Sequence, residues 1–286
     1  MNNLTEVWAC IDGSRYSTAV CDYASWISTN MDIPLTLLHT IEHITRVAAP
    51  DLSGAIGLGS QEALLEELTA VEAQRSSLLL EQGKLMLNAA RERVARSGVT
   101  KPTLKQRHDG LTESLIAMED SIGVLVLGVR GEEHAQDEHH LGSHLESCIR
   151  ALHRPILVVN CEFQTPERIM LAYDGSEASG KALAMLANSQ LFASAPVHLV
   201  TVGESPSRTI ELQRAATEKL RAAGHEVIAA TLSGDPSETL HAYQDEHAID
   251  LTLMGAFSHT RLREWVLGSV TVKMLLSASR PLLLLR

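Results

Sequence analysis

Short apolar runs alternate with longer, helix-like stretches along the C-terminal part of the chain. The predicted strands are the continuous apolar runs at 167–173, 197–202, 225–231, 251–255 and 281–286. The predicted helices cover 178–193, 207–223, a stretch that begins with GDPSETL (234–240), and 268–279. Strands that are apolar throughout and alternate with helices indicate a parallel sheet with helices on both faces. Because crossovers between parallel strands are right-handed, we expect a doubly wound α/β fold.

The N-terminal part of the chain repeats the same landmarks in the same order. Each copy has an apolar run ending in Asp-Gly-Ser, then an apolar run ending in Gly, then Leu-Gly-Ser, and finally Arg-Pro before a last apolar run. The first landmark reads VWACIDGSRYS (7–17) in one copy and IMLAYDGSEAS (169–179) in the other. We therefore predict two domains, 1–160 and 166–286.

The two copies are of unequal length. Asp12 and Asp174 are 162 residues apart, whereas Gly128 and Gly255 are 127 apart, so the first copy carries 35 additional residues. We place this insertion at about 50–85. A Gly-rich loop there leads into a run rich in Leu, Ala, Glu, Gln and Arg, which favours a helix over 60–97. Gly98 stands where a C-terminal helix cap is expected. We interpret the helix as a lid or an interface arm.

Composition narrows the classes of partner. The 286 residues are 45% hydrophobic and 21% charged, as in globular proteins. Aromatic residues make up only 3% and the net charge is −11, so we expect no nucleic-acid partner. No apolar run reaches the ~18 residues that span a bilayer, and the N-terminus has no secretory signal, so we expect a cytoplasmic protein without a membrane partner. Four cysteines without a C-x-x-C motif favour buried free thiols.

Residues suited to bind an anion gather where the first and fourth strands of the second copy end. Ligands of doubly wound sheets bind at the carboxyl ends of the strands, at the switch point of the strand order. Gly268 and Ser269 begin a helix there and offer free N–H groups, a hydroxyl and the positive end of the helix dipole. Asp174, at the end of the adjacent strand, is suited to a ribose hydroxyl or to a metal ion on a phosphate.

These motifs resemble the universal stress protein family, and the chain looks like two such domains in tandem. Nucleotide-binding members of the family carry G-x2-G-x9-G-[ST] after strand 4 and an Asp after strand 1. The resemblance implies Rossmann-like domains, each with a five-stranded parallel sheet of order 3-2-1-4-5. It also implies that the domains pair through their last strands as an internal pseudo-dimer. A further homodimer is expected where the paired domains leave an apolar edge.

The resemblance also implies a ligand, ATP or a related adenine nucleotide, with or without Mg²⁺. Adenine would lie near Val202, the ribose at Asp174 and the phosphates in the Gly loop. The positions carried over in the second domain are Asp174, Val202, Gly255, Ser258, Gly268, Ser269 and Val270. Ser258 stands where the family has its second Gly, and a Cβ there would cost about 1–2 kcal/mol if that position needs a positive φ.

The first copy departs from the pattern more strongly. Ten residues separate Gly131 from Gly142, one more than in the family pattern, and His144 replaces the following Val. The loop at 128–143 has a net charge of −3, whereas the loop at 255–269 has +1. Because like charge repels a triphosphate, we predict that the second domain holds the nucleotide and that the first site is degenerate.

Three alternatives stay open at this point. The His- and acid-rich stretch EEHAQDEHHLGSH (132–144) has side chains that ligate divalent metals, although its spacing is unspecific and also fits a solvated loop. A slow nucleotide hydrolase would use Asp174 and a divalent ion. An apolar small molecule could instead occupy a cleft between the domains, with the inserted arm as its cover.

Overall fold

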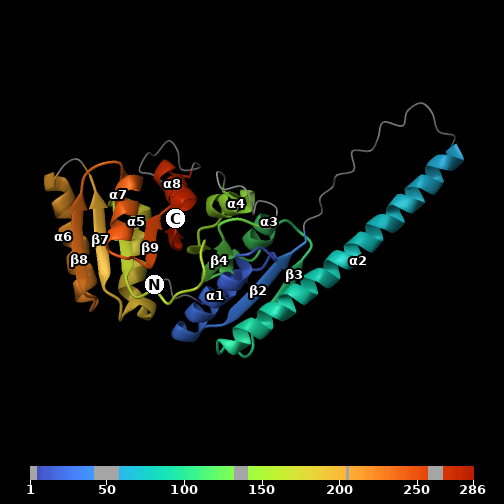
Figure 1. Ribbon diagram of the computed structural model, residues 1–286, viewed down its shortest axis with the longest axis horizontal. Coiled ribbons are helices and arrows are strands. Elements are labelled where there is room, and N and C mark those ends of the chain that lie inside the picture. The colour runs from blue at the N-terminus through green and yellow to red at the C-terminus, as the bar shows by residue number, and fades with distance from the viewer. Residues whose placement is uncertain (1–4, 42–57, 132–140, 204–205, 257–266) are drawn as a thin grey trace.

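A computed structural model describes residues 5–41, 58–131, 141–203, 206–256 and 267–286, with the backbone alone for 58–65 and 206–208. Ten strands in these ranges form one sheet in the order β3-β2-β1-β4-β5-β10-β9-β6-β7-β8 (Figure 1). Read outward from the centre of the molecule, each half has the order 5-4-1-2-3. The predicted sheet order is therefore confirmed in both halves.

The elements of the first half are β1 (Val7–Cys10), α1 (Ser17–Met31), β2 (Leu35–Thr40), α2 (Leu58–Arg96), β3 (Thr103–Arg107), α3 (Leu111–Ile116), the 3-10 helix η1 (Glu119–Ser121), β4 (Val124–Gly128), α4 (Ser143–Ala151) and β5 (Ile156–Val159). Those of the second half are β6 (Ile169–Ala172), α5 (Glu177–Asn188), the 3-10 helix η3 (Gln190–Phe192), β7 (Val197–Val202), α6 (Pro206–Ala222), β8 (Val227–Leu232), α7 (Pro236–Glu246), β9 (Leu251–Gly255), α8 (Ser269–Ser277) and β10 (Leu282–Leu285).

Strand residues alternate between two hydrophobic cores, one on each face of the sheet. In β1, Val7 and Ala9 face the core covered by α1, α2, α5 and α6, whereas Trp8 and Cys10 face the core covered by α3, α4, α7 and α8. Each core runs through both halves of the chain. Inner strands such as β1, β4 and β5 are buried on both faces, which explains why their sequences are continuously apolar instead of alternating. The edge strands β3 and β8 are partly exposed.

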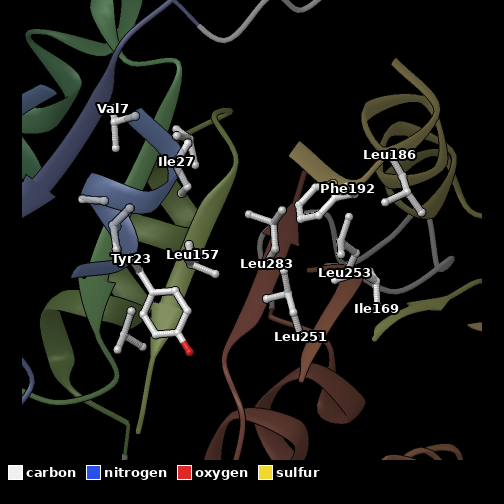
Figure 2. Packing of buried hydrophobic residues seen from close by; sticks show 14 of the residues in the cluster. Val7, Tyr23, Ile27, Leu157, Ile169, Leu186, Phe192, Leu251, Leu253 and Leu283 are labelled. Atoms are coloured by element: carbon white, nitrogen blue, oxygen red, sulfur yellow. The ribbon is translucent and has the colours of Figure 1, made fainter. Parts of the chain in front are cut away.

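The two halves join through the only antiparallel pair in the described sheet, β5 with β10. Leu157 faces Leu283 across this seam, and Asn160 donates two hydrogen bonds to the carbonyl oxygens of Ala278 (2.6 Å) and Arg280 (2.9 Å). Figure 2 shows Leu157 and Leu283 on the two neighbouring strands, with buried side chains of both halves on either side. The expected pairing through the last strands therefore occurs within one chain.

Helix α2 contains most of the difference between the halves. β2 and β3 are separated by residues 41–102, whereas the equivalent β7 and β8 are separated only by 203–226. Its 39 residues correspond to about 58 Å of helix. The N-terminal end of α2 projects well past the domain that carries it (Figure 1). The helix predicted from composition at 60–97 is thus confirmed.

The C-terminal half of α2 docks on its own domain through small and apolar residues. Leu87, Ala90 and Val94 are buried, and a Cβ on Gly83 would lie 2.5 Å from His39 Cδ2. Such a distance is shorter than any van der Waals contact, so glycine is what lets the helix axis approach β2 this closely. On the adjacent face, Arg93 forms a two-bond ion pair with Asp22 of α1 (both 2.7 Å). The direction of α2 is therefore fixed by packing.

Several local predictions are confirmed, and one is corrected. The strands at 197–202 and 251–255 begin and end as expected, and the predicted cap Gly98 has a φ of +99°. The helix predicted at 178–193 instead ends at Asn188 and is followed by η3, because Ser189 accepts a hydrogen bond from Leu191 N (3.3 Å) and starts a new turn.

Two further predictions concern the burial of the cysteines and the absence of a membrane-spanning segment. Cys10, Cys21 and Cys148 are free and buried, whereas Cys161 is only half-buried. Within the described ranges, none of the helices combines the length and the hydropathy that a membrane crossing requires.

Candidate functional site

A cleft of about 170 Å³ opens in the second half, where β6 and β9 end and α8 begins. Six of the seven predicted site residues line this cleft: Asp174, Val202, Gly255, Gly268, Ser269 and Val270. They come from three strands and one helix that are far apart in the sequence. The seventh residue, Ser258, lies outside the described residues.

Asp174 is positioned by a tight turn between β6 and α5. Gly175 has a φ of +76°, which glycine adopts without the strain that a Cβ would bring. The turn brings Ser176 N within 2.9 Å of Asp174 Oδ1, and Ser176 in turn caps α5 by accepting a hydrogen bond from Ser179 N (3.1 Å). The carboxylate is thereby fixed at an exposed position at the mouth of the cleft.

The N-terminus of α8 forms the opposite wall of the cleft. Gly268 precedes the helix and provides no side-chain cap, and Thr271 Oγ1 donates to Ala256 O (3.1 Å), which holds the first turn against the end of β9. The amide groups of an uncapped first turn and the helix dipole together attract an anion. An anionic group of a ligand would therefore be stabilised at this wall.

The structure shows why residue 255 is a glycine, which the sequence alone did not reveal. A Cβ at this position would lie 2.8 Å from Ala178 Cβ and 3.1 Å from Ser179 N, in the first turn of α5. The close approach that requires glycine is therefore first of all an approach of α5 to β9. The same residue lines the cleft, so the tight packing also shapes the site.

The apolar wall contains residues that the sequence did not assign to the site. Val200, Pro236 and Leu240 line the cleft together with Val202. Pro236 begins α7, and its predecessor Asp235 caps the helix by accepting hydrogen bonds from Ser237 and Glu238; the bond from the Ser237 hydroxyl contributes most to lowering the pKa of Asp235 to about 2. The GDPSETL signal predicted this helix start, but only the fold shows that it faces β7.

A second cleft, of about 260 Å³, lies at the equivalent strand ends of the first half. Its lining contains the counterparts of the motif residues: Asp12, Gly128, Gly131, Gly142 and His144. It also contains Arg75, Leu79, Gln82 and Met86, which all come from α2. The inserted helix thus forms part of the wall of its own domain's cleft.

The described lining of the first cleft is rich in basic and imidazole groups. Arg75 and Arg130 contribute positive charge beside the carboxylate of Asp12, and His39 holds Ile11 O at 2.7 Å through Nδ1. Asp12 Oδ1 accepts hydrogen bonds from Ser14 N and Ser17 Oγ (both 2.9 Å). The acidic residues that led us to expect a degenerate first site lie at 132–138, outside the described residues.

Neither a metal centre nor a reactive thiol emerges from the described part of the chain. No group of three or more His, Cys, Asp or Glu side chains is arranged there to hold a metal ion. Most of the His-rich stretch at 132–144 lies outside the described residues, so that prediction is untested. Burial raises the pKa of Cys21 to about 12 and that of Cys148 to about 11, which keeps both thiols protonated.

Comparisons with known proteins identify the family to which this fold and these paired clefts belong. The model of the universal stress protein family matches the chain twice, at 5–160 and at 166–286. The chain therefore belongs to the universal stress protein family and carries two copies of its domain. A universal stress protein from Synechocystis sp. is 33% identical over 287 residues, covering 99% of this chain and all of that protein.

Solved structures of low sequence identity share the fold over the whole chain. A universal stress protein from Archaeoglobus fulgidus is 18% identical, with a TM-score of 0.74 and 99% of each chain covered. A putative universal stress protein from Pseudomonas aeruginosa is 16% identical, with a TM-score of 0.65, covering 99% of this chain and 94% of that one. The arrangement of two domains in one sheet is thus shared with these proteins.

Proposed function

We propose that this universal stress protein binds ATP or a related adenine nucleotide in the cleft of its second half and acts as a cytoplasmic binding module in a stress response. The observation that carries the proposal is the convergence of Asp174, Val202, Gly255, Gly268, Ser269 and Val270 on one cleft. The family resemblance assigns these positions to nucleotide binding. Neither nucleic acid nor a membrane is part of the proposal.

Each wall of the cleft suits one part of an adenine nucleotide. Val202, Pro236 and Leu240 offer an apolar slot for the base. The exposed carboxylate of Asp174 accepts hydrogen bonds from ribose hydroxyls, or contacts Mg²⁺ that accompanies the phosphates. The uncapped start of α8 at Ser269 receives a phosphate through its amide groups.

The first half is proposed to be unsuited to the same ligand. Its slot beside β2 is lined by Leu79, Gln82 and Met86 of α2, whereas none of the described side chains of the equivalent helix α6 lines the second cleft. Its 128–143 loop also has a net charge of −3. Both differences disfavour a nucleotide whose base and phosphates must enter together.

Calorimetric titration of the full chain with ATP and Mg²⁺ tests the stoichiometry, and photolabelling with azido-ATP tests the location. We expect one nucleotide per chain and label on peptides from 166–286. Label on peptides from 1–160 alone, or no measurable binding, would contradict the proposal.

The side chains that line the second cleft bear on whether the protein would also hydrolyse a bound nucleotide. Among the described residues that line the second cleft, Asp174 is the only carboxylate, and the lining has no Lys, Arg or His. This composition favours binding over catalysis. Turnover of ATP by the purified protein with Mg²⁺, abolished in Asp174→Ala, would instead establish a slow hydrolase.

The first cleft supports a second candidate function, the binding of an apolar or amphiphilic small molecule. Leu79 and Met86 of α2 and Leu111 and Leu145 of the domain body form apolar walls around it. The inserted helix covers this cleft, whereas the sequence suggested that it would cover a cleft between the domains. Mass spectrometry of a denaturing extract distinguishes the two functions, because it detects either an adenine nucleotide or an apolar compound.

A further inference from the structure

Helix α2 exposes most of the large apolar side chains found on the described surface. Seven such side chains are exposed in the described residues, and four of them belong to α2: Leu68 (44% exposed), Val71 (58%), Leu78 (60%) and Leu85 (70%). Exposed apolar groups that gather on one element mark an interaction surface more often than scattered ones do.

The four residues form one stripe along the helix. Val71, Leu78 and Leu85 are spaced by seven residues, and Leu68 precedes Val71 by three. A seven-residue spacing drifts by only about 20° per repeat around a straight helix, so these side chains share one face. Apolar residues spaced by three and four are typical of the seam between two paired helices.

The stripe faces away from the domain that carries α2. Leu85 lies two positions after the buried Gly83 and two before the buried Leu87, and residues two apart point to opposite sides of a helix. The described side chains at 66–75 are all exposed, and this end of the helix projects past the domain (Figure 1). A second helix could therefore lie along the stripe without meeting the domain body.

The charges of α2 select the partner and its direction. The stretch 66–74 contains Glu66, Glu67 and Glu72 and no basic residue, which gives −3. The stretch 75–96 contains five basic and two acidic residues, which gives +3. When two copies of α2 lie side by side in opposite directions with their Leu78 side chains level, Glu72 of each lies level with Lys84 of the other and Arg75 with Glu81. The helix dipoles are then also aligned favourably. The parallel arrangement brings like charges together.

We propose that α2 is a homodimerisation helix that pairs antiparallel with α2 of a second copy of this chain. In the matching register, Val71 of each copy packs against Leu85 of the other, and the two Leu78 side chains meet at the twofold axis. The two domain bodies then lie at opposite ends of the helix pair. This contact is separate from the β5–β10 seam and does not depend on the proposed nucleotide site.

Sedimentation equilibrium of the full chain over a range of concentrations tests the dimer. We expect a dimer in the wild type and at least a tenfold higher dissociation constant in Leu78→Glu/Leu85→Glu, with an unchanged far-ultraviolet circular dichroism spectrum. The matched control is Ile116→Glu/Ile228→Glu, which changes two exposed apolar residues outside α2 and should stay dimeric. A monomeric wild type, or a double variant that dimerises as well as the wild type, would overturn the proposal.

Disulfide formation tests the direction of pairing. Val71→Cys and Leu85→Cys are made in a Cys161→Ser background, because Cys161 is the half-buried thiol and the others are buried. We expect the mixture to give a mixed disulfide between the two proteins under mild oxidation. If Val71→Cys alone cross-links with itself as readily as it cross-links with Leu85→Cys, the antiparallel arrangement is wrong.

Discussion

The two strand-end clefts share the same turns and differ in what stands beside them. Both follow an Asp-Gly-Ser turn with a positive φ at the glycine, and both end at a helix that begins with Gly-Ser. Both clefts are bordered by the start of the helix before the fourth strand, at Leu111 and at Pro236, but among the described residues only the first cleft also has a wall from the helix after the second strand, with Leu79 and Met86 of α2. An insertion far from the motif residues has therefore changed the cleft more than substitutions within the motif have.

The difference extends to charge. The described lining of the second cleft has one charged side chain, Asp174, whereas that of the first has Asp12 together with Arg75 and Arg130. One of the two added cations comes from α2. The same scaffold thus presents an apolar slot beside a helix start without a side-chain cap in the second half, and a cleft with two arginines and a wall from α2 in the first half.

The largest expected difference between the two clefts comes from placing a carboxylate at the same position of each. Val270→Glu puts a negative charge at the first turn of α8, and at about 5 Å from a phosphate with an effective dielectric constant of ~20 it costs about 3 kcal/mol. We expect ATP affinity to fall about a hundredfold. His144→Glu, the equivalent change in the first half, should leave it unchanged. Calorimetric titration measures both, and equal losses would place the nucleotide elsewhere.

A second test addresses the docking of α2. In Gly83→Ala, the added Cβ would meet His39 Cδ2 at 2.5 Å and Gln106 Nε2 at 2.2 Å, so either the helix or these two side chains must shift. We expect a loss of about 2 kcal/mol in the free energy of unfolding and unchanged ATP affinity. The control is Gly180→Ala in α5, where a Cβ meets nothing within 4 Å, so it should stabilise by up to about 1 kcal/mol. Urea unfolding compares them.

Replacing Asp174 and Asp12, which occupy equivalent positions in the two clefts, should give a third, smaller effect on ATP affinity. Asp174→Ala removes an exposed acceptor at the second cleft, and we expect ATP affinity to fall about tenfold, as for the loss of one hydrogen bond to a charged group. Asp12→Ala should leave the affinity unchanged while lowering stability, because Ser14 N and Ser17 Oγ lose their acceptor. A loss of ATP affinity in Asp12→Ala would show that the first cleft also contributes.

The smallest expected effect is on the pH dependence of the free energy of unfolding, to which His198 of β7 contributes and the equivalent residue of β2 does not. Burial lowers the pKa of His198 below 6.5, and the equivalent position in β2 is Thr36. Below pH ~6.5 the unfolded chain takes up this proton more readily than the folded one, so the free energy of unfolding falls as the pH drops. In His198→Thr, the free energy of unfolding should fall less between pH 7 and pH 5 than it does in the wild type. The free energy of unfolding is measured by urea unfolding at each pH. An equal fall in the wild type and in His198→Thr would contradict this prediction.

The sequence predicts the fold well because both of its signals are local and repeated. Continuous Val and Leu runs fix the strands at 197–202 and 251–255, and glycines such as Gly98 mark where helices end. The landmark repeat then predicts two sheets of one order. The register of the seam, Leu157 facing Leu283, follows only once both halves are folded.

The candidate site is less predictable, because its walls come from packing. The motif names Asp174 and Gly268, but Pro236 and Leu240 belong to the cleft only through the position of α7 against β7. The path of α2 across the first cleft depends on the contact of Gly83 with His39, which no local pattern encodes. Composition predicts the helix and leaves its direction open.

The β5–β10 seam connects two halves of a single polypeptide, and this makes it insensitive to dilution. The residues between β5 and β6, 160–168, are a short tether, so each half meets the other at a fixed effective concentration. A contact between separate chains weakens as the protein is diluted, because its occupancy follows mass action. Because β5 and β10 are antiparallel, the two clefts lie at opposite edges of the sheet, and at nanomolar protein they should keep this arrangement in every molecule, whatever the oligomeric state of the sample.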